Sequence, residues 1–291
     1  MISSKKKKII PSKKTKKINN TNLTKNLLEK GKVSFKKEDL IAEGAFGQVY
    51  KLRINNKLYS DYVVKYIKPV LEYQILNNVV NKLSLGRLNA IKKVDFYKEI
   101  RVLKEYQNYK ISPQLIYTND EPKNLYYIME KLDKTLLDMI IEDILEPNHI
   151  EKLIQLFKRY LRQKYRHSDL HSNNIMYSYK YNDFRFIDWG LNYTLKNKKM
   201  FEEINNKHPL YYNDNKDIHL NSISLCALEV ILEDKCINNP KKWNNITKKF
   251  ITFKNKNKPE IKMSWLGKKY NDYHKKKFLK RINNLRNKSK K

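Results

Sequence analysis

The chain has 291 residues, and its 62 Lys and Arg against 30 Asp and Glu give a formal net charge of +32. This length suits one large domain or two lobes, and 40% hydrophobic residues are enough to fill a core, which excludes wholesale disorder. No apolar stretch is long enough for a signal-peptide core or a membrane span, and two cysteines cannot form a disulfide framework. We therefore expect a soluble intracellular protein of the cytoplasm or nucleus, or of a virion if its source is viral.

The positive charge is concentrated at the two ends of the chain. Residues 1–37 hold 13 Lys and one acidic residue, and residues 241–291 hold 19 Lys or Arg and two acidic residues. The middle, 38–240, has a net charge of only +3. Two explanations stay open: AT-rich codons, which favour Lys, Asn, Ile and Tyr, or a surface that binds nucleic acid or an anionic membrane through released counterions.

Residues 1–37 contain almost no apolar residue before Leu23 and predict a basic disordered arm. The next segment, 41–50, has alternating apolar residues on either side of Gly44 and Gly47, which predicts a hairpin of two strands. Glycines at such a turn let backbone N–H groups approach phosphate oxygens without a Cβ in the way. The first glycine of a G-x-G-x-x-G pattern is replaced here by Ala42.

Lys65 lies 21 residues after Gly44, within the apolar run 63–67. A lysine in such a strand either lies at an edge and faces water or is buried with an acidic partner. Phe96, Ile100 and Leu103 mark one face of a predicted helix, and Glu99 flanks that face. Glu99 is therefore the candidate partner of Lys65.

The densest polar motif is His-Ser-Asp-Leu-His-Ser-Asn-Asn at 167–174, and Asp188 follows Asp169 by 19 residues. This spacing predicts a short loop, a pair of strands and a second loop, which would bring Asp169, Asn174 and Asp188 together. A carboxylate that accepts a proton, with an amide and a second carboxylate as metal ligands, suits metal-assisted phosphoryl transfer.

His167 and His171 are spaced as i and i+4, which raises the alternative of a zinc site. Neither the glutamate of an H-E-x-x-H motif nor a cysteine cluster accompanies them. We instead expect His167 to pack and hydrogen-bond within its loop.

Together these motifs resemble the protein-kinase-like family over roughly residues 38–235. H-x-D-x-x-x-x-N stands as His167, Asp169 and Asn174, and the family's D-F-G motif stands as Asp188-Trp189-Gly190. The glycine-rich turn, strand lysine and helix glutamate precede them in the family's order. The resemblance implies an α+β, two-lobed protein-kinase-like fold, with an N-terminal β-sheet lobe plus helix and a mainly helical C-terminal lobe.

The implied organisation is a basic arm at 1–37, an N-terminal lobe at 38–131, a shortened C-terminal lobe at 132–270 and a basic helix or tail at 271–291. Within the C-terminal stretch we expect Trp243, Phe250, Phe253 and Trp265 to pack in a core. The apolar residues at 278–285 have helical spacing, which favours a helix for the last segment.

The resemblance also implies roles. Lys65 would hold the α- and β-phosphates of ATP and be oriented by Glu99, Asp169 would accept the hydroxyl proton, and Asn174 and Asp188 would hold Mg2+ or Mn2+. Backbone groups of Glu130 and Leu132 would bind adenine, and Met129 would be the gatekeeper residue. The implied ATP-binding residues are Ile41, Ala42, Glu43, Gly44, Ala45, Phe46, Gly47, Gln48, Val49, Lys65, Met129, Glu130 and Leu132.

The function that this resemblance implies is an atypical serine/threonine protein kinase, for which acidic protein substrates would suit the charge. Two departures favour a small-molecule phosphotransferase instead: His171 stands where protein kinases carry Lys, and no A-P-E motif follows Asp188. A third alternative is a non-catalytic scaffold that binds nucleic acid through its basic ends. Ser168 replaces the Arg of H-R-D, so we expect no control by a phosphorylated activation loop. The oligomeric state stays open.

Overall fold

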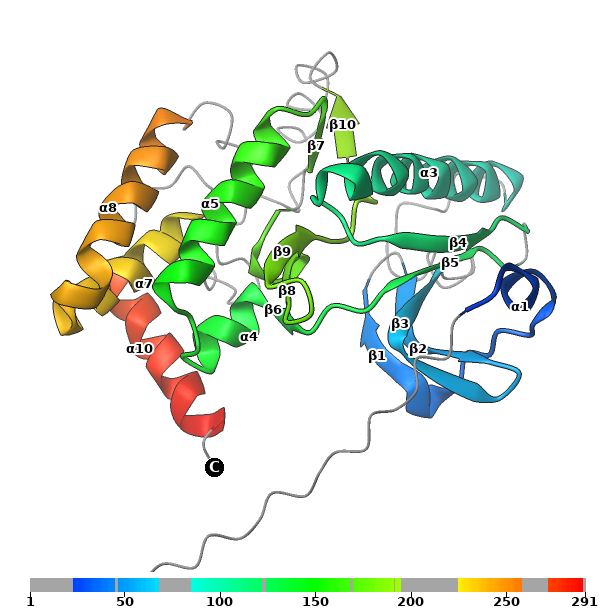
Figure 1. Ribbon diagram of the computed structural model, residues 1–291, viewed down its shortest axis with the longest axis horizontal. Coiled ribbons are helices and arrows are strands. Elements are labelled where there is room, and N and C mark those ends of the chain that lie inside the picture. Colours follow the sequence, from blue (N-terminus) through cyan, green and yellow to red (C-terminus); the bar gives the residue numbers. More distant parts are fainter. Residues whose placement is uncertain are drawn as a thin grey trace, which may run out of the picture.

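The computed structural model describes residues 23–44, 47–67, 85–121, 124–167, 170–190, 192–194, 225–257 and 272–289. A five-stranded antiparallel sheet and a long helix lie to one side of a group of helices (Figure 1). The predicted α+β class is confirmed, and this arrangement is compatible with a two-lobed fold. Among the described residues, no helix is long and apolar enough to cross a membrane.

The five-stranded sheet has the order β1-β2-β3-β5-β4, and all of its neighbouring strands are antiparallel. Its strands are β1 (Leu40–Glu43), β2 (Gly47–Ile54), β3 (Lys57–Ile67), β4 (Leu115–Asn119) and β5 (Tyr126–Glu130). Asn55 and Asn56 join β2 to β3 with φ angles of 48° and 63°. Asn tolerates this left-handed conformation better than most residues, and two such residues form a turn whose twist matches the paired strands.

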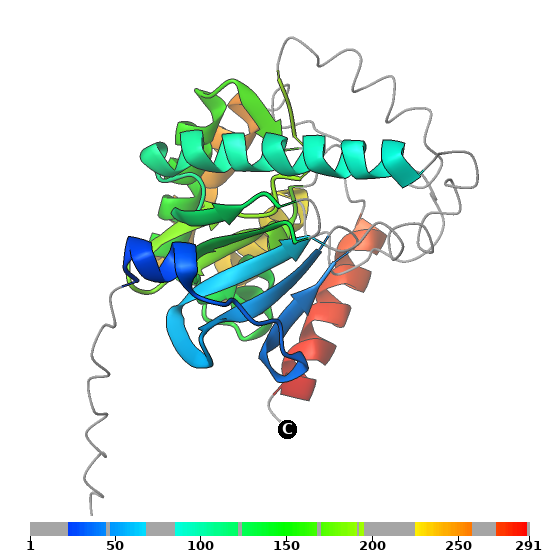
Figure 2. The same cartoon turned by 90° about the vertical axis from the view of Figure 1, so that its right-hand side faces the viewer.

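Residues of β5 alternate between the two faces of the sheet, as the pleat of a strand requires. Tyr127 and Met129 join the core beneath α3 (Leu85–Tyr106), whereas Tyr126 and Ile128 join a second apolar cluster on the other face. Figure 2 views the sheet from the side of α1 (Lys25–Lys30), with α3 running across the top. On α3, Phe96, Ile100 and Leu103 are all buried, so the predicted apolar face is confirmed.

The other half of the molecule contains helices and two small sheets, β6-β8-β9 and β7-β10. Its helices are α4 (Leu136–Ile141), α5 (Pro147–Leu161), α7 (Leu225–Asn238), α8 (Pro240–Lys256) and α10 (Asp272–Ser289). Its strands are β6 (Lys134–Thr135), β7 (Tyr165–His167), β8 (Ile175–Ser178), β9 (Asp183–Phe186) and β10 (Asn192–Thr194). A short 3-10 turn, η4 (Ser172–Asn174), precedes β8. Two others adjoin the elements of the sheet half: η1 (Lys37–Asp39) precedes β1, and η3 (Gln107–Tyr109) follows α3. β8 and β9 are the strand pair that the spacing of the two polar motifs predicted.

The core of this half is built around α5. The ring of Phe157 on α5 lies 5.3 Å from that of Phe186 on β9 and 6.4 Å from that of Phe253 on α8. Trp243, Phe250 and Phe253 are all buried, which confirms the predicted packing for these three residues, and Trp265 lies outside the described residues. The predicted C-terminal helix is present as α10, which buries Ile282 against the rest of the core.

Residues 1–37 were predicted to be a disordered arm, but their described part, 23–37, is folded. α1 lies within it, and the hydroxyl of Thr24 accepts the N–H of Leu27 at its start. Leu28 is buried in the second apolar cluster, and Val33 pairs with Ile54 of β2. A few apolar residues therefore dock this segment on the sheet, although its overall composition is that of a lysine-rich arm.

His149 at the start of α5 predicts a pH dependence of stability. Its Nδ1 accepts the N–H of Glu146 at 3.0 Å, and its ring lies 4.9 Å from that of Tyr177. Burial lowers the pKa of His149 in the folded protein, whereas an unfolded chain protonates its histidines near pH 6.5. Below that pH the unfolded state therefore binds more protons, and the free energy of unfolding falls.

We expect His149→Gln to lose less stability than the wild type between about pH 7.5 and about pH 5, because glutamine keeps a capping acceptor without an ionisable ring. Urea denaturation across this range measures the difference in unfolding free energy. Parallel pH curves for the two proteins would contradict the prediction.

Candidate active site

A buried lysine joins three elements that are distant in the sequence. The Nζ of Lys65 on β3 donates to Oε1 of Glu99 on α3 and to Oδ1 of Asp188 beyond β9, in both cases at 2.8 Å. The side chains of Lys65 and Glu99 are 8% and 4% exposed, whereas that of Asp188 is 42% exposed. Lys65 is therefore bonded to Glu99, its predicted partner, and also to Asp188, which was not predicted to share it.

Burial and the ion pairs shift the pKa values of this cluster in opposite directions. Burial lowers the pKa of Lys65, but attraction to Asp188 and Glu99 outweighs it, so this pKa lies well above its ordinary value. Burial raises the pKa of Glu99 against the opposing effect of Lys65, while Lys65 lowers the pKa of Asp188. Because desolvation offsets most of the attraction in a buried ion pair, such a cluster contributes little net stability and is a candidate for function.

The backbone at Asp188 is held in an unusual conformation. Its φ of 59° lies in the left-handed region, which is unfavourable for a residue with a Cβ. The next residue, Trp189, is fully buried and donates from Nε1 to the carbonyl of Phe186 at 3.1 Å. On the other side, Nε2 of His167 donates to the carbonyl of Ile187 at 2.8 Å, and the His167 and Trp189 rings lie 4.7 Å apart. The predicted structural role of His167 is thus confirmed.

Asn174 lies at the same end of the β8–β9 hairpin as Asp188. Asn174 directly precedes β8, and Ile187, one residue after β9, donates its N–H to the carbonyl of Asn174 at 3.0 Å. The side-chain nitrogen of Asn174 lies 3.1 Å from Nε2 of His171. The hairpin therefore gathers two of the three predicted polar residues, while Asp169 lies outside the described residues.

The β1–β2 hairpin lies against the lysine. The N–H of Gly44 donates to the carbonyl of Gly47 at 2.9 Å, and Val49 is paired with Lys65. A Cβ on Gly47 would come within 2.6 Å of the carbonyl oxygen of Tyr66 and 3.5 Å of Lys65 Cε, so the close pairing of β2 and β3 requires glycine. Gly44 has no comparable restriction, because its nearest atom would be 3.9 Å away. Ala45 and Phe46 lie outside the described residues.

The remaining predicted nucleotide-binding residues are on β1, β2 and the end of β5. Ile41, Ala42, Glu43 and Gln48 lie on the hairpin strands, with the side chain of Ile41 exposed, and Met129 and Glu130 are buried on β5. After β5, Lys131 donates its N–H to the carbonyl of Asp61 at 2.9 Å. Leu132 is buried, and its N–H donates to no other residue in the described part of the chain.

Tyr127 belongs to the cluster but was not predicted. Its hydroxyl donates to Oε1 of Glu99 at 2.9 Å, and it stands opposite Lys65 in the pairing of β3 with β5. Alternation along 125–129 could have assigned it to the same face as Met129. The residue it meets depends on strand register, which the sequence pattern does not contain.

Comparisons with known proteins identify no relative: the chain matches no family model, and no curated protein matches it. Within the described residues, no group of three or more His, Cys, Asp or Glu is placed to hold a metal ion. The zinc alternative raised by His167 and His171 therefore has no support there.

The two glycines of the hairpin make a matched pair for testing its geometry. We expect Gly47→Ala to lower the free energy of unfolding by about 1–3 kcal/mol, because the added methyl group overpacks against the backbone of β3. Gly44→Ala should stay within about 0.5 kcal/mol of the wild type. Urea denaturation measures both variants, and equal stabilities would contradict this geometry.

Proposed function

We propose that this chain is an ATP-dependent phosphotransferase of two-lobed, protein-kinase-like fold, and that it transfers the γ-phosphoryl group to a serine or threonine hydroxyl of a protein. The observation that carries the proposal is the Lys65–Glu99–Asp188 cluster beside the glycine hairpin. A buried cation held between two carboxylates is suited to bind phosphate oxygens, since an anionic ligand can replace one carboxylate as its partner.

ATP fits the groups around this cluster. The backbone turn at Gly44 and Gly47 adjoins Lys65, so phosphates bound by the lysine would lie under the hairpin. The Leu132 N–H is open to an adenine acceptor, and the carbonyl of Glu130 is the corresponding candidate acceptor. The expected clamp on the base is formed by Ile41 and Val49.

The residues present also fit Mg2+ or Mn2+. Asp188 offers a partly exposed carboxylate and Asn174 an amide oxygen, and Mg2+ binds few protein oxygens beside those of a phosphate substrate. The bound ion would neutralise charge on the transferred phosphoryl group. Asp169, within the H-x-D-x-x-x-x-N motif, is the proposed base for the acceptor hydroxyl.

Phosphoryl transfer is tested with radiolabelled ATP and three acceptors: a casein-type acidic protein, a basic protein and a mixture of small metabolites. We expect label on protein, and a loss of at least about 100-fold in Lys65→Ala, Asp169→Ala and Asp188→Asn, because each removes a charge from the reacting groups. Lys51→Ala, on the neighbouring strand, serves as the control that keeps activity.

Each outcome of this assay decides between functions. Label that enters only metabolites would replace the protein kinase by a small-molecule phosphotransferase, the alternative that His171 favours. Equal labelling by wild type and Asp169→Ala would reject the proposed base. If the wild type labels no acceptor, the proposed phosphotransferase is rejected and the non-catalytic scaffold is favoured.

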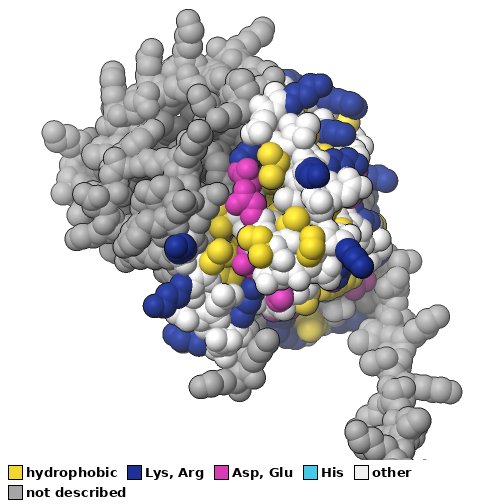
Figure 3. All heavy atoms as spheres, turned by 90° about the vertical axis from the view of Figure 1, so that its left-hand side faces the viewer, with side chains coloured by type: hydrophobic (Ala, Val, Ile, Leu, Met, Phe, Trp, Pro, Cys, Tyr) yellow, Lys and Arg dark blue, Asp and Glu magenta, His cyan; other side chains and the backbone are white. Residues whose placement is uncertain are grey.

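We also propose that the face formed by α5 and α8 binds nucleic acid. α8 carries six lysines and no acidic residue. It lies alongside α5 through the ion pairs Lys242–Glu146 and Lys249–Glu151, both at 2.6 Å. Lys158 and Arg162 extend the exposed basic surface at the other end of α5. Figure 3 shows Lys and Arg side chains at the upper right of this side of the molecule and others at its lower left, with hydrophobic and acidic side chains between them.

Charge reversal on α8 tests this surface. We expect the triple variant Lys241→Glu, Lys248→Glu, Lys256→Glu to weaken binding of duplex DNA or RNA. The slope of log K against log salt should fall by about 0.9 for each phosphate group that the variant no longer neutralises. Fluorescence anisotropy across a salt series measures both quantities.

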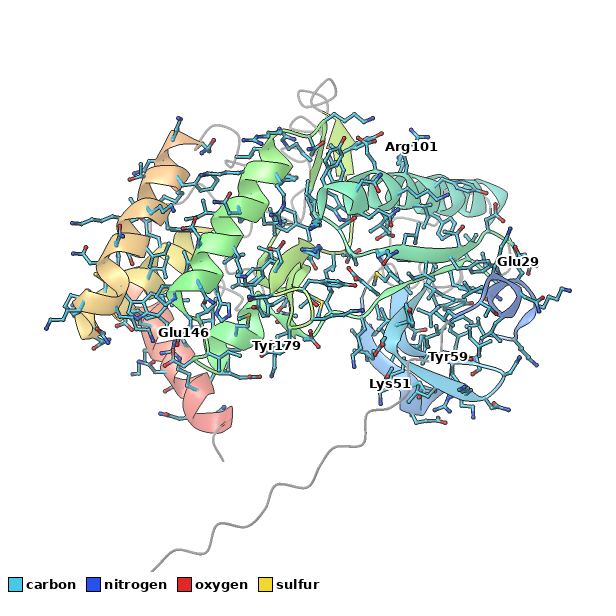
Figure 4. The ribbon with its side chains drawn as sticks, in the orientation of Figure 1. Glu29, Lys51, Tyr59, Arg101, Glu146 and Tyr179 are labelled. Atoms are coloured by element: carbon cyan, nitrogen blue, oxygen red, sulfur yellow. The ribbon has the colours of Figure 1, made fainter. Side chains whose placement is uncertain are left out.

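A matched control reverses three exposed lysines of the sheet half instead: Lys37, Lys51 and Lys57. Figure 4 shows Lys51 in the sheet half of the molecule, away from α8. Equal weakening in the two triple variants would mean that net charge alone drives binding. Binding to anionic vesicles but not to nucleic acid would contradict the proposed partner.

A further inference from the structure

Glu99 receives two donors at one oxygen. Nζ of Lys65 and the hydroxyl of Tyr127 both donate to Oε1, at 2.8 Å and 2.9 Å. Lys65 and Tyr127 are directly opposite each other on β3 and β5, so their side chains share the face of the sheet that α3 covers. Tyr127 is 1% exposed, which places its hydroxyl and the carboxylate in the same water-excluded contact.

The ring of Tyr127 lies between Lys65 and a residue of α3. Lys65 Nζ lies 5.8 Å from its centroid, a distance at which the ring face attracts a cation. From α3, the ring of Phe96 lies 6.4 Å from that of Tyr127. Tyr127 is thus held by the sheet and by the helix, and its rotation is restricted.

Two other buried tyrosines of the chain use their hydroxyls differently. The hydroxyl of Tyr106 donates to the backbone carbonyl of Tyr165, and that of Tyr160 accepts the backbone N–H of His167. Those contacts tie one backbone segment to another. The Tyr127 hydroxyl instead meets an ionised side chain of the candidate site.

The second donor matters because Lys65 is shared. Its ammonium group also donates to Asp188, and a phosphate ligand would compete for the same protons. Whenever Lys65 turns towards another anion, a buried Glu99 without a second donor would be left short of hydrogen bonds, which is costly for a carboxylate away from water. Tyr127 keeps Glu99 in place from the rigid sheet, independently of where Lys65 points.

We propose that Tyr127 is a positioning residue of the phosphotransferase site: its hydroxyl fixes Glu99, and through Glu99 it holds the Lys65 ammonium group where phosphate oxygens bind. This inference rests on the function proposed above. It adds a side chain from β5 to the cluster of Lys65, Glu99 and Asp188.

The test compares Tyr127→Phe with Tyr126→Phe. Each variant removes one hydroxyl and keeps the ring, but Tyr126 lies on the opposite face of the same strand. We expect Tyr127→Phe to lower kcat/KM about tenfold or more, the effect that removing a hydrogen bond to a charged group produces. The decrease should appear mainly in kcat, because placement of Lys65 matters most as charge develops on the transferred group. Tyr126→Phe should stay within about twofold of the wild type.

A second arm separates positioning from a merely structural role. In a Glu99→Ala background there is no side-chain acceptor left for the Tyr127 hydroxyl to orient, so adding Tyr127→Phe should change kcat/KM by less than about twofold. A structural role would give the same decrease in both backgrounds. Circular dichroism at the assay temperature verifies that every variant is folded.

The outcomes distinguish the two levels of the proposal. An inactive wild type would overturn the phosphotransferase function and this role with it. An active wild type, with Tyr127→Phe equal to Tyr126→Phe, would overturn the role of Tyr127 alone. A decrease of equal size in the wild-type and Glu99→Ala backgrounds would also overturn it.

Discussion

The position of Lys65 is the constraint on which the centre of the molecule depends. An ammonium group removed from water must keep opposite charges close to it, because an unpaired buried charge costs several kcal/mol. Glu99 comes from α3 and Asp188 from the segment after β9, so this requirement holds the helix, the sheet and the β8–β9 hairpin in one arrangement. The left-handed backbone at Asp188 and the buried ring of Trp189 are parts of the same arrangement.

Charge is distributed quite differently over the rest of the chain. Most of the lysines of α8 lie on the surface, where water solvates them, and two of them pair with Glu146 and Glu151 at α5. In the cluster around Lys65, the lysine and Glu99 are buried and Asp188 is partly exposed. The exposed lysines of α8 therefore concern the proposed nucleic-acid partner, whereas the proposed chemistry depends on the three groups of this cluster.

Local patterns in the sequence were informative where local physics decides the structure. The spacing of Phe96, Ile100 and Leu103 predicted one face of α3, because a helix brings every third or fourth residue to the same side. The spacing between the two polar motifs predicted β8 and β9. The same reasoning failed for residues 23–37, since a lysine-rich composition hides how few apolar contacts are needed to dock α1.

By itself the sequence determined the order of the polar motifs, the periodicity of the helix and strands, and Glu99 as the candidate partner of Lys65. These follow from residue type and spacing along one chain. Only the tertiary structure decided that Asp188 shares the lysine, that Tyr127 meets Glu99, and that Gly47 rather than Gly44 must lack a side chain. The requirement for glycine at position 47 depends on the register of β2 with β3. The contacts of Asp188 with Lys65 and of Tyr127 with Glu99 are hydrogen bonds between residues 123 and 28 positions apart, which no local pattern encodes.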